Sequence, residues 1–274
     1  MKRSKKHGVT IILVLIFLVG ACVMLYPTIS DYVNSKTQSR VVADYKELTE
    51  KLDDDTSEEL LAAAEDYNSR LSKLPSALLQ YEQIAGYDEL LNISDGIMGY
   101  ITIDKIGVEL PIYHGTSEEV LSVACGHLQG SSLPVGGEST HAVLSAHRGL
   151  PSAKLFTELD KLEIGDTFTV TVLDRVLTYE VDQIRIVLPN EVEELTIKEG
   201  QDLCTLFTCT PYGINTHRLL VRGRRVERAS TLPTINVANE AYLIDPIIVA
   251  PAASVPMLLL LLIWLLVRYR KKKS

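Results

Sequence analysis

The chain has 274 residues, and its 35 acidic side chains outnumber its 27 lysines and arginines, which gives a formal net charge of −8. Nine of these basic residues lie at the two ends, at 2–6 and 268–273, where there is no acidic residue, so the part between them is strongly acidic. Nucleic-acid binding requires Lys and Arg side chains that neutralise phosphates, so this balance argues against a nucleic-acid partner. Four cysteines in the whole chain also exclude a disulfide framework.

Two apolar runs lie near the ends of the chain. Residues 9–26 follow a basic tail at 1–8, and residues 247–267 lead into a basic tail at 268–274. Each run approaches the roughly 20 residues that cross a bilayer core. Because basic flanks stay in the cytoplasm, the runs predict two transmembrane helices in the cell membrane, with the main domain extracellular. A cleaved signal peptide is the alternative for the first run, since residues 19–22 resemble a loose lipoprotein cleavage site.

Residues 27–95 predict a helical region that adjoins the membrane. Within 41–74 we expect two short helices around the acidic turn at 53–55, with Thr56 and Glu59 as a capping box for the second. The apolar stripe of this second helix comprises Leu60, Ala64, Tyr67, Leu71 and Leu74. About two heptads are too few for a coiled coil, so we expect a helix packed on the flank of the main domain.

The main domain, at 96–227, consists of short segments rich in Val, Ile, Thr and Tyr, which is typical of strands. The candidate strands are 97–103, 108–113, 142–146, 167–173, 176–187, 203–209 and 218–226. Residues 173–176 read as a tight hairpin connection. This spacing predicts an all-β barrel or sandwich, followed by a linker at 228–246.

Cys209 ends one of these strands, just before a loop that contains Pro and Gly. Strand ends and loops are where reactive groups are displayed, so Cys209 is the candidate nucleophile. Cys204 has apolar strand neighbours and no nearby loop, and Cys125 has no recognisable partner, so both are interpreted as structural. A zinc site is disfavoured, because the gap from Cys204 to Cys209 lies on a strand and no second ligand pair follows.

A reactive thiol also needs a base, because the thiolate is the nucleophile. His147 occupies a strand end like that of Cys209 and is the first candidate, with His217 as the competitor. Arg218 is the first residue of the next candidate strand. If the two strands form a hairpin, the Arg218 guanidinium lies near the Cys209 thiol. The remaining histidines of the outer domain lie in turn-like sequence and are interpreted as structural or solvated: His114, His127 and His141.

These residues resemble the sortase family. Residues 205–209 read Thr-Leu-Phe-Thr-Cys, with Arg218 nine positions later and His147 upstream. The flanking segments 110–116, 126–128, 132–137 and 210–217 resemble the class C, pilus-polymerising sortases of Gram-positive bacteria. The second membrane segment also fits that class. The resemblance implies a closed eight-stranded β-barrel with an N-terminal helical flank and two transmembrane helices.

The resemblance further implies a cysteine transpeptidase that cleaves a Leu-Pro-Xaa-Thr-Gly-like sorting signal between Thr and Gly. Cys209, His147 and Arg218 match the catalytic positions, and the substrate-binding residues are expected to be Leu206, Thr208 and Thr210. A lysine amine of a pilin would resolve the thioester and polymerise pili at the membrane. No metal or organic cofactor is implied.

Three alternatives to pilus polymerisation stay open: a sortase that anchors proteins to the cell wall, a thiol hydrolase with water as acceptor, and a surface scaffold without enzymatic activity. One departure from class C is visible in the sequence. Many class C members carry an Asp-Pro-aromatic lid, and residues 74–95 contain no such tripeptide. We therefore expect a site that is open or gated in a different way.

Overall fold

In the computed structural model of the chain, residues 4–227 and 263 are described. The expected linker at 228–246 and the expected second span at 247–267 lie outside the described residues, apart from residue 263. The chain divides into two compact units, one made of Met1–Tyr32 and Leu232–Ser274 and the other of Val33–Thr231. All residues of the candidate site belong to the second unit.

Helix α1 (Ser4–Thr49) is a single helix of 46 residues. Within the described residues it contains the one candidate membrane span, Val14–Thr49, which includes an 18-residue window with a mean hydropathy of 1.9. A signal sequence has the same properties, so both interpretations of 9–26 stand. The expectation of a short first helix within 41–74 is wrong, because α1 continues unbroken from the apolar segment to Thr49.

Helix α2 (Asp54–Leu71) packs on the flank of the barrel, as predicted. Its buried stripe is formed by Leu61, Ala64, Tyr67 and Leu71. The predicted capping box is wrong, because Asp53 is the N-cap and its carboxylate accepts a hydrogen bond from the Thr56 backbone N–H at 2.7 Å. Asp is as good an N-cap as Thr or better, so the helix begins three residues earlier than expected.

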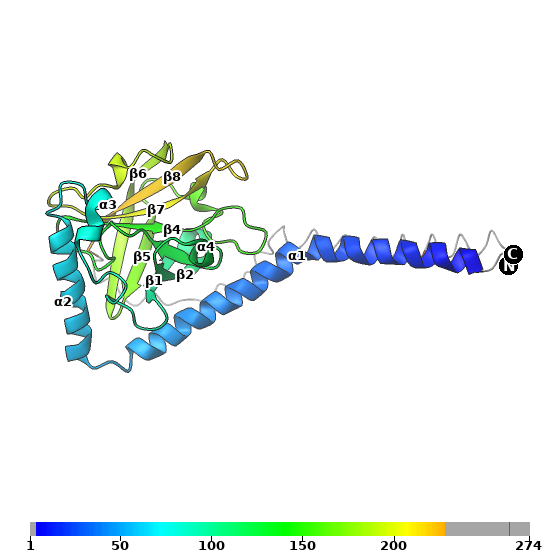
Figure 1. The fold of residues 1–274 in the computed structure, drawn as a ribbon, viewed down its shortest axis with the longest axis horizontal. Helices are drawn as coiled ribbons and strands as arrows, with labels where there is room; N and C mark the ends of the chain where they lie inside the picture. The colour runs from blue at the N-terminus through cyan, green and yellow to red at the C-terminus, as the bar shows by residue number, and fades with distance from the viewer. Residues whose placement is uncertain (1–3, 228–262, 264–274) are drawn as a thin grey trace. The chain divides into compact units, whose positions relative to one another are not determined.

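The second unit contains a closed barrel of eight strands, which confirms the predicted barrel fold (Figure 1). The strands are β1 (Ile97–Ile103), β2 (Val108–His114), β3 (Cys125–His127), β4 (Thr140–Ser145), β5 (Thr167–Val172), β6 (Arg175–Val187), β7 (Asp202–Thr210) and β8 (His217–Arg225). Their order around the barrel is β1-β2-β3-β4-β7-β8-β6-β5. The β4–β7 and β2–β3 pairs are parallel, and the other pairs are antiparallel.

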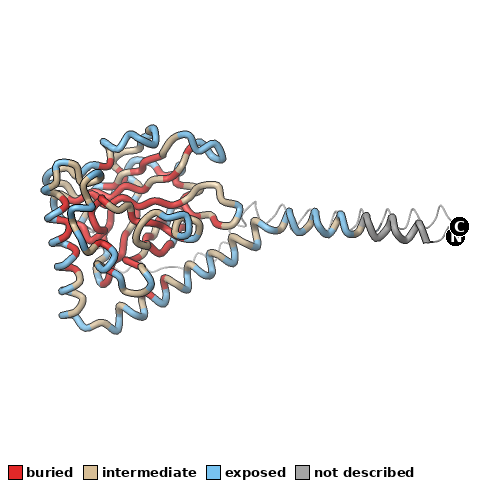
Figure 2. The backbone as a smooth tube through the Cα atoms, viewed as in Figure 1, coloured by how far each residue is buried: buried red, intermediate tan, exposed pale blue. Residues whose placement is uncertain are grey.

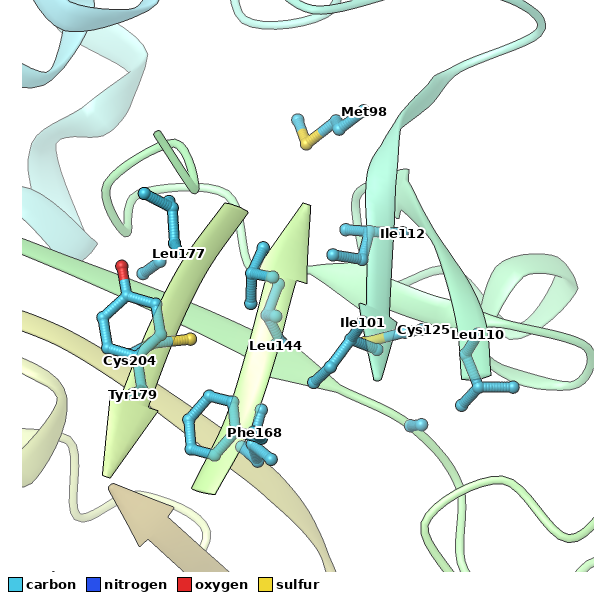
Figure 3. Close-up of a cluster of buried hydrophobic side chains, with 14 of the residues drawn as sticks. Met98, Ile101, Leu110, Ile112, Cys125, Leu144, Phe168, Leu177, Tyr179 and Cys204 are labelled. Atoms are coloured by element: carbon cyan, nitrogen blue, oxygen red, sulfur yellow. The ribbon is translucent and has the colours of Figure 1, made fainter. Parts of the chain in front are cut away.

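The interior of the barrel is filled by alternate side chains of its strands, so the buried backbone in Figure 2 follows the strands. Figure 3 shows this core, in which Ile101, Ile112, Leu144 and Phe168 are fully buried or nearly so. Helix α1 joins the barrel through Tyr45, whose hydroxyl donates to the Met98 carbonyl and accepts from the Leu173 N–H, both at 2.9 Å. The barrel is therefore a rigid support for the residues on its outer face.

Short helices occupy the connections. They are α3 (Ala77–Gln80), α4 (Glu118–Leu121) and the single 3₁₀ turns η1 (Tyr81–Gln83), η2 (Asp104–Ile106), η3 (Leu159–Lys161) and η4 (Glu193–Leu195). Two of them bear on the candidate site: α3 lies against the outer face of the β4–β7–β8 sheet, and α4 lies in the β2–β3 connection.

Candidate active site

Cys209 lies near the end of β7, on the outer face of the barrel. Successive side chains of a strand point to opposite faces. Cys204 and Leu206 of β7 belong to the interior cluster, so Thr205, Phe207 and Cys209 lie on the outer face. Cys209 is partly exposed. The position predicted from the strand end is therefore one that a substrate can reach.

Arg218 is the direct cross-strand partner of Cys209 in the antiparallel β7–β8 pair. Residues opposite each other in such a pair have side chains on the same face, with Cβ atoms about 4.5–5.5 Å apart. The Arg218 guanidinium donates through Nη1 to the carbonyls of Asn215 and His217, at 3.2 and 3.1 Å. Within the described part of the chain, no carboxylate pairs with Arg218, which leaves the cation available to a ligand.

His147 lies two residues beyond β4, which runs parallel to β7 with Ser145 opposite Phe207. The pairing continues past β4, because the Ala146 N–H donates to the Phe207 carbonyl at 3.4 Å and the Thr208 hydroxyl donates to the Ala146 carbonyl at 2.8 Å. Extended by one more residue, this register places His147 beside Cys209. The structure thus brings together the three residues that the sequence singled out as nucleophile, base and cation.

His217, the competing base, lies on the other face of the sheet. It is the partner of Thr210, one position removed from the Cys209–Arg218 pair, and neighbouring positions on a strand face opposite ways. Its Nδ1 lies 2.9 Å from the Thr216 hydroxyl. This position favours His147 over His217 as the base.

His147 has a partner that sequence reasoning missed. Its Nε2 lies 3.2 Å from each carboxylate oxygen of Glu118, the first residue of α4. The two residues are 29 positions apart, and the sequence around Glu118 shows no pattern that sets it apart from its neighbour Glu119. Only the fold of the β2–β3 connection could reveal this pair.

The expected substrate-binding residues lie on the wrong face of β7 for direct contact. Leu206 is fully buried in the core, and Thr208 is buried with its hydroxyl on the Ala146 carbonyl. Thr210 is also buried, and its hydroxyl accepts from Arg148 Nη1 at 3.3 Å. These positions do not support the predicted substrate contacts. The three side chains instead fix the end of β7 to the interior and to the segment after β4.

The other cysteines of the barrel are confirmed as structural. Cys125 and Cys204 are completely buried among core side chains (Figure 3). Burial raises the pKa of the Cys125 thiol and of the Cys204 thiol well above the ordinary value, because a thiolate would lose its hydration there. Neither thiol has the properties of a nucleophile.

Three further histidines are structural, as expected. His127 is buried, with Nε2 on the Ser132 carbonyl at 2.8 Å and Nδ1 on the Tyr87 hydroxyl at 2.9 Å. His141 is buried between the Thr196 carbonyl and the Thr205 hydroxyl. The ring nitrogens of His114 lie on two backbone carbonyls, at 2.9 and 2.8 Å.

A short apolar helix covers the outer face next to Cys209. Leu78 of α3 packs on a cluster of Val143, Leu195 and Leu220, and Phe207 packs on the same cluster. Leu220 is the cross-strand partner of Phe207, which lies two residues before Cys209 on the same face. Residues 74–95 contain no Asp-Pro-aromatic tripeptide, and the contact that this region makes with the outer face through Leu78 is apolar.

A cavity of about 420 Å³ adjoins this helix. It lies between residues 72–78 and the β6–β7 connection, and its apolar lining includes Leu74, Leu195 and Ile197. Helix α3 also rests on Gly130, where an added Cβ would lie 3.1 Å from the Leu78 Cα and 2.7 Å from the Tyr81 ring. Leu78 and Leu195 belong both to the lining of this cavity and to the outer-face cluster that includes Phe207.

Comparison with known proteins identifies the family. A sortase domain model matches residues 101–226. The crystal structure of sortase C1 from Streptococcus agalactiae shares 47% sequence identity with this chain and superimposes with a TM-score of 0.63, covering 69% of this chain and 99% of that one. The chain belongs to the sortase family of cysteine transpeptidases. Its barrel is the sortase fold, and the resemblance to class C sortases seen in the sequence is confirmed.

Two other sortases extend the comparison. Sortase C from Streptococcus pneumoniae is 45% identical, with a TM-score of 0.63 and coverage of 70% of this chain and 100% of that one. Sortase D of Bacillus subtilis (strain 168) is 31% identical over 131 residues, or 47% of this chain. The chain spans 63% of the length of that curated relative.

Proposed function

We propose that this sortase is a membrane-anchored transpeptidase that polymerises pilins. The observation that carries the proposal is that Cys209 of β7 and Arg218 of β8 lie opposite each other, with His147 in the segment that follows the neighbouring strand β4. Such an arrangement supplies a nucleophile, an oxyanion partner and a proton carrier on one exposed face.

In the first half-reaction, the Cys209 thiolate attacks the Thr carbonyl carbon of a Leu-Pro-Xaa-Thr-Gly-like signal. The Arg218 guanidinium leaves the carbonyls of Asn215 and His217 and stabilises the oxyanion of the tetrahedral intermediate. His147 then donates its proton to the departing glycine amine, the C–N bond breaks, and a thioester forms.

In the second half-reaction, a lysine amine of the next pilin attacks the thioester carbonyl. His147, now neutral, accepts a proton from the amine, and the Cys209 thiolate leaves as the isopeptide bond forms. The proton returns His147 to the charged form with which the cycle began. Each step uses groups of this chain and the two substrates alone.

The apolar part of the sorting signal has a place to bind. We propose that the Leu and Pro of the signal lie along the outer face at Phe207 and Leu220 and reach the cavity beside Leu195. This path replaces the contacts expected from Leu206, Thr208 and Thr210. It requires Leu78 of α3 to move aside when substrate binds.

Three observations support pilins as substrates and the membrane as the location. The solved neighbours are class C sortases, and the structure of the Streptococcus pneumoniae enzyme is described as informative on pilin substrate specificity. Helix α1 contains an apolar segment of membrane-spanning length. The basic tails of the sequence favour a two-pass topology with the barrel outside the cell.

The proposal is tested by replacing the thiol in cells that produce the enzyme together with its pilin. Cys209→Ala is expected to abolish covalent pilin ladders that survive boiling in detergent, and His147→Ala is expected to do the same. His217→Ala serves as the matched control and should leave the ladders intact.

If Cys209→Ala still formed covalent pilin ladders, the proposed enzymatic function would be wrong and a scaffold role would be favoured. Product analysis by mass spectrometry, with an added amine acceptor, separates transpeptidation from hydrolysis. A free Thr carboxylate as the sole product would identify a thiol hydrolase.

A further inference from the structure

The contact between His147 and Glu118 has no part in the reaction steps described above. A carboxylate only accepts hydrogen bonds, so the ring nitrogen that faces it, Nε2, must carry a proton. In the neutral imidazole this leaves Nδ1 as the lone-pair nitrogen. With Nε2 held by the carboxylate, Nδ1 is the ring nitrogen left for proton exchange.

The segment that carries Glu118 is firmly held. The Ser117 hydroxyl caps α4 by accepting from the Val120 N–H at 3.4 Å, and the Gly115 N–H donates to the Tyr87 hydroxyl at 3.0 Å. The segment also lies directly on β3, because a Cβ added at Gly126 would come within 2.3 Å of the Gly115 carbonyl oxygen. Glu118 is thus placed by the barrel and by the buried Tyr87.

We propose that Glu118 is a positioning residue for His147, holding the imidazole with Nε2 protonated and Nδ1 directed at the reacting atoms. The proposal rests on the proposed function, since it assigns a role within the same site. When His147 is the imidazolium, the carboxylate also balances its positive charge. Substrate that covers this face excludes water, which strengthens the electrostatic interaction between the two groups.

This role differs from one in stability. The His147 side chain is 24% exposed and the Glu118 side chain 79% exposed, and ion pairs at such positions contribute little to folding. Loss of Glu118 should therefore leave the fold intact and act on the chemical step. Hydrogen-bond partners that orient metal-binding histidines change metal affinity or activity by about 10- to 100-fold, and we expect an effect of similar size here.

The kinetic test uses the full chain in detergent micelles, with a fluorogenic peptide that contains Leu-Pro-Glu-Thr-Gly as the probe. Glu118→Leu removes the acceptor oxygens, whereas Glu118→Gln keeps one of them. We expect Glu118→Leu to lower kcat about 10- to 100-fold at unchanged KM, and Glu118→Gln to recover most of that loss. Glu119→Leu, one position along α4, is the matched control and should behave as the wild type.

A wild-type kcat in Glu118→Leu would overturn the proposal. An equal loss of kcat in Glu119→Leu, or a change in KM with kcat unaltered, would overturn it as well. A second readout does not depend on turnover. In ¹⁵N spectra of histidine-labelled protein, the His147 ring should show a single Nε2–H tautomer at a pH where it is neutral, and a mixture in Glu118→Leu. His147→Gln assigns the signal.

The two proposals fail in different ways. If wild type and Cys209→Ala process the peptide and pilin equally, the proposed function fails, and the tautomer spectrum still decides whether Glu118 orients His147. If the wild type alone is active but the tautomer is the same with and without Glu118, only the positioning role fails.

Discussion

At the scale of single residues, Gly149 ties the His147 segment to the loop after Cys209. Its φ is +77°, in the region that favours glycine, and an added Cβ would lie 2.9 Å from the Tyr212 ring. Tyr212 belongs to the β7–β8 loop, so the loops that follow His147 and Cys209 touch at this point. A side chain at Gly149 would push them apart.

We therefore expect Gly149→Ala to lower kcat/KM at least about tenfold, because displacements near 1 Å in a catalytic site carry costs of up to about 10²-fold. Gly165→Ala is the matched control, since Gly165 also has a positive φ, +93°, but nothing within 4 Å of an added Cβ. It should lose about 1 kcal/mol of stability and keep its activity. Equal kinetics for the two variants would show that the contact with Tyr212 is unimportant.

The sequence predicted the positions of three candidate site residues in the fold, and their catalytic roles stay predictions. Cys209, His147 and Arg218 stand at strand ends, and the strand pattern places two of them opposite each other. The burial of Leu206 gives no support to its predicted contact with substrate, because residues of β7 at odd spacings from Cys209 face the interior of the barrel. Glu118 was missed, since a contact across 29 positions leaves no local pattern.

At the scale of elements, we expect α3 to restrict access to Cys209, because it packs on the outer face two residues from that thiol along β7. Leu78 packs on the outer-face cluster, whereas its neighbour Leu79 is 76% exposed. Truncation of Leu78 removes apolar contact worth about 1–2 kcal/mol, and so raises the population with α3 displaced about tenfold. The contact is apolar, so it should respond little to salt.

The measurement is the rate at which a bulky thiol reagent labels Cys209 in the full chain. We expect Leu78→Ala to raise that rate about tenfold and Leu79→Ala, which makes the same change at an exposed position, to leave it unchanged. Equal rates for wild type and Leu78→Ala would mean that α3 does not restrict access to the thiol.

Among the elements, periodicity predicted the long ones well. The bounds of β1 agree with the expected strand, and β5 and β6 join through the expected hairpin. Strand β3 was not predicted, because three residues are too few for alternation to be visible. Helix α2 began earlier than expected, since two acceptable N-cap residues, Asp53 and Thr56, lie one turn apart and only packing chooses between them.

At the scale of the whole molecule, two buried histidines make stability depend on pH. Burial lowers the pKa of His127 and that of His141 to about 4, against an ordinary value of about 6.5. Between these values the unfolded chain binds protons that the folded chain does not, so stability falls as the pH falls. Each histidine costs about 3 kcal/mol over that interval by linkage.

We expect the thermal unfolding temperature of the full chain in detergent to be constant between pH 7 and 8 and to drop steeply between pH 6.5 and 4. Replacing His141 by Gln should lower stability at pH 7. It should also reduce the number of protons taken up on unfolding by about one, so that stability depends less steeply on pH. If the unfolding temperature of His141→Gln changed with pH as steeply as that of the wild type, His141 would already be protonated in the folded state.

The predicted whole-chain arrangement was recovered in part. The barrel and its helical flank are as the sequence indicated, because alternation and the motif at 205–209 together specify the fold. The first apolar run forms part of one long helix, α1. The second, at 247–267, lies outside the described residues, so the two-pass topology remains a prediction.

The parallel pairing of β4 with β7 has a consequence for how the enzyme matures. His147 and Cys209 lie 62 residues apart in the chain, as do the hydrogen-bonded Ala146 and Thr208, and the Arg218 that faces Cys209 arrives only with β8, the last strand. Closing such a long loop is a slow, late event in folding. Before β4, β7 and β8 have paired, the thiol therefore has neither His147 nor Arg218 beside it. We therefore expect the chain to become reactive only when its barrel is complete.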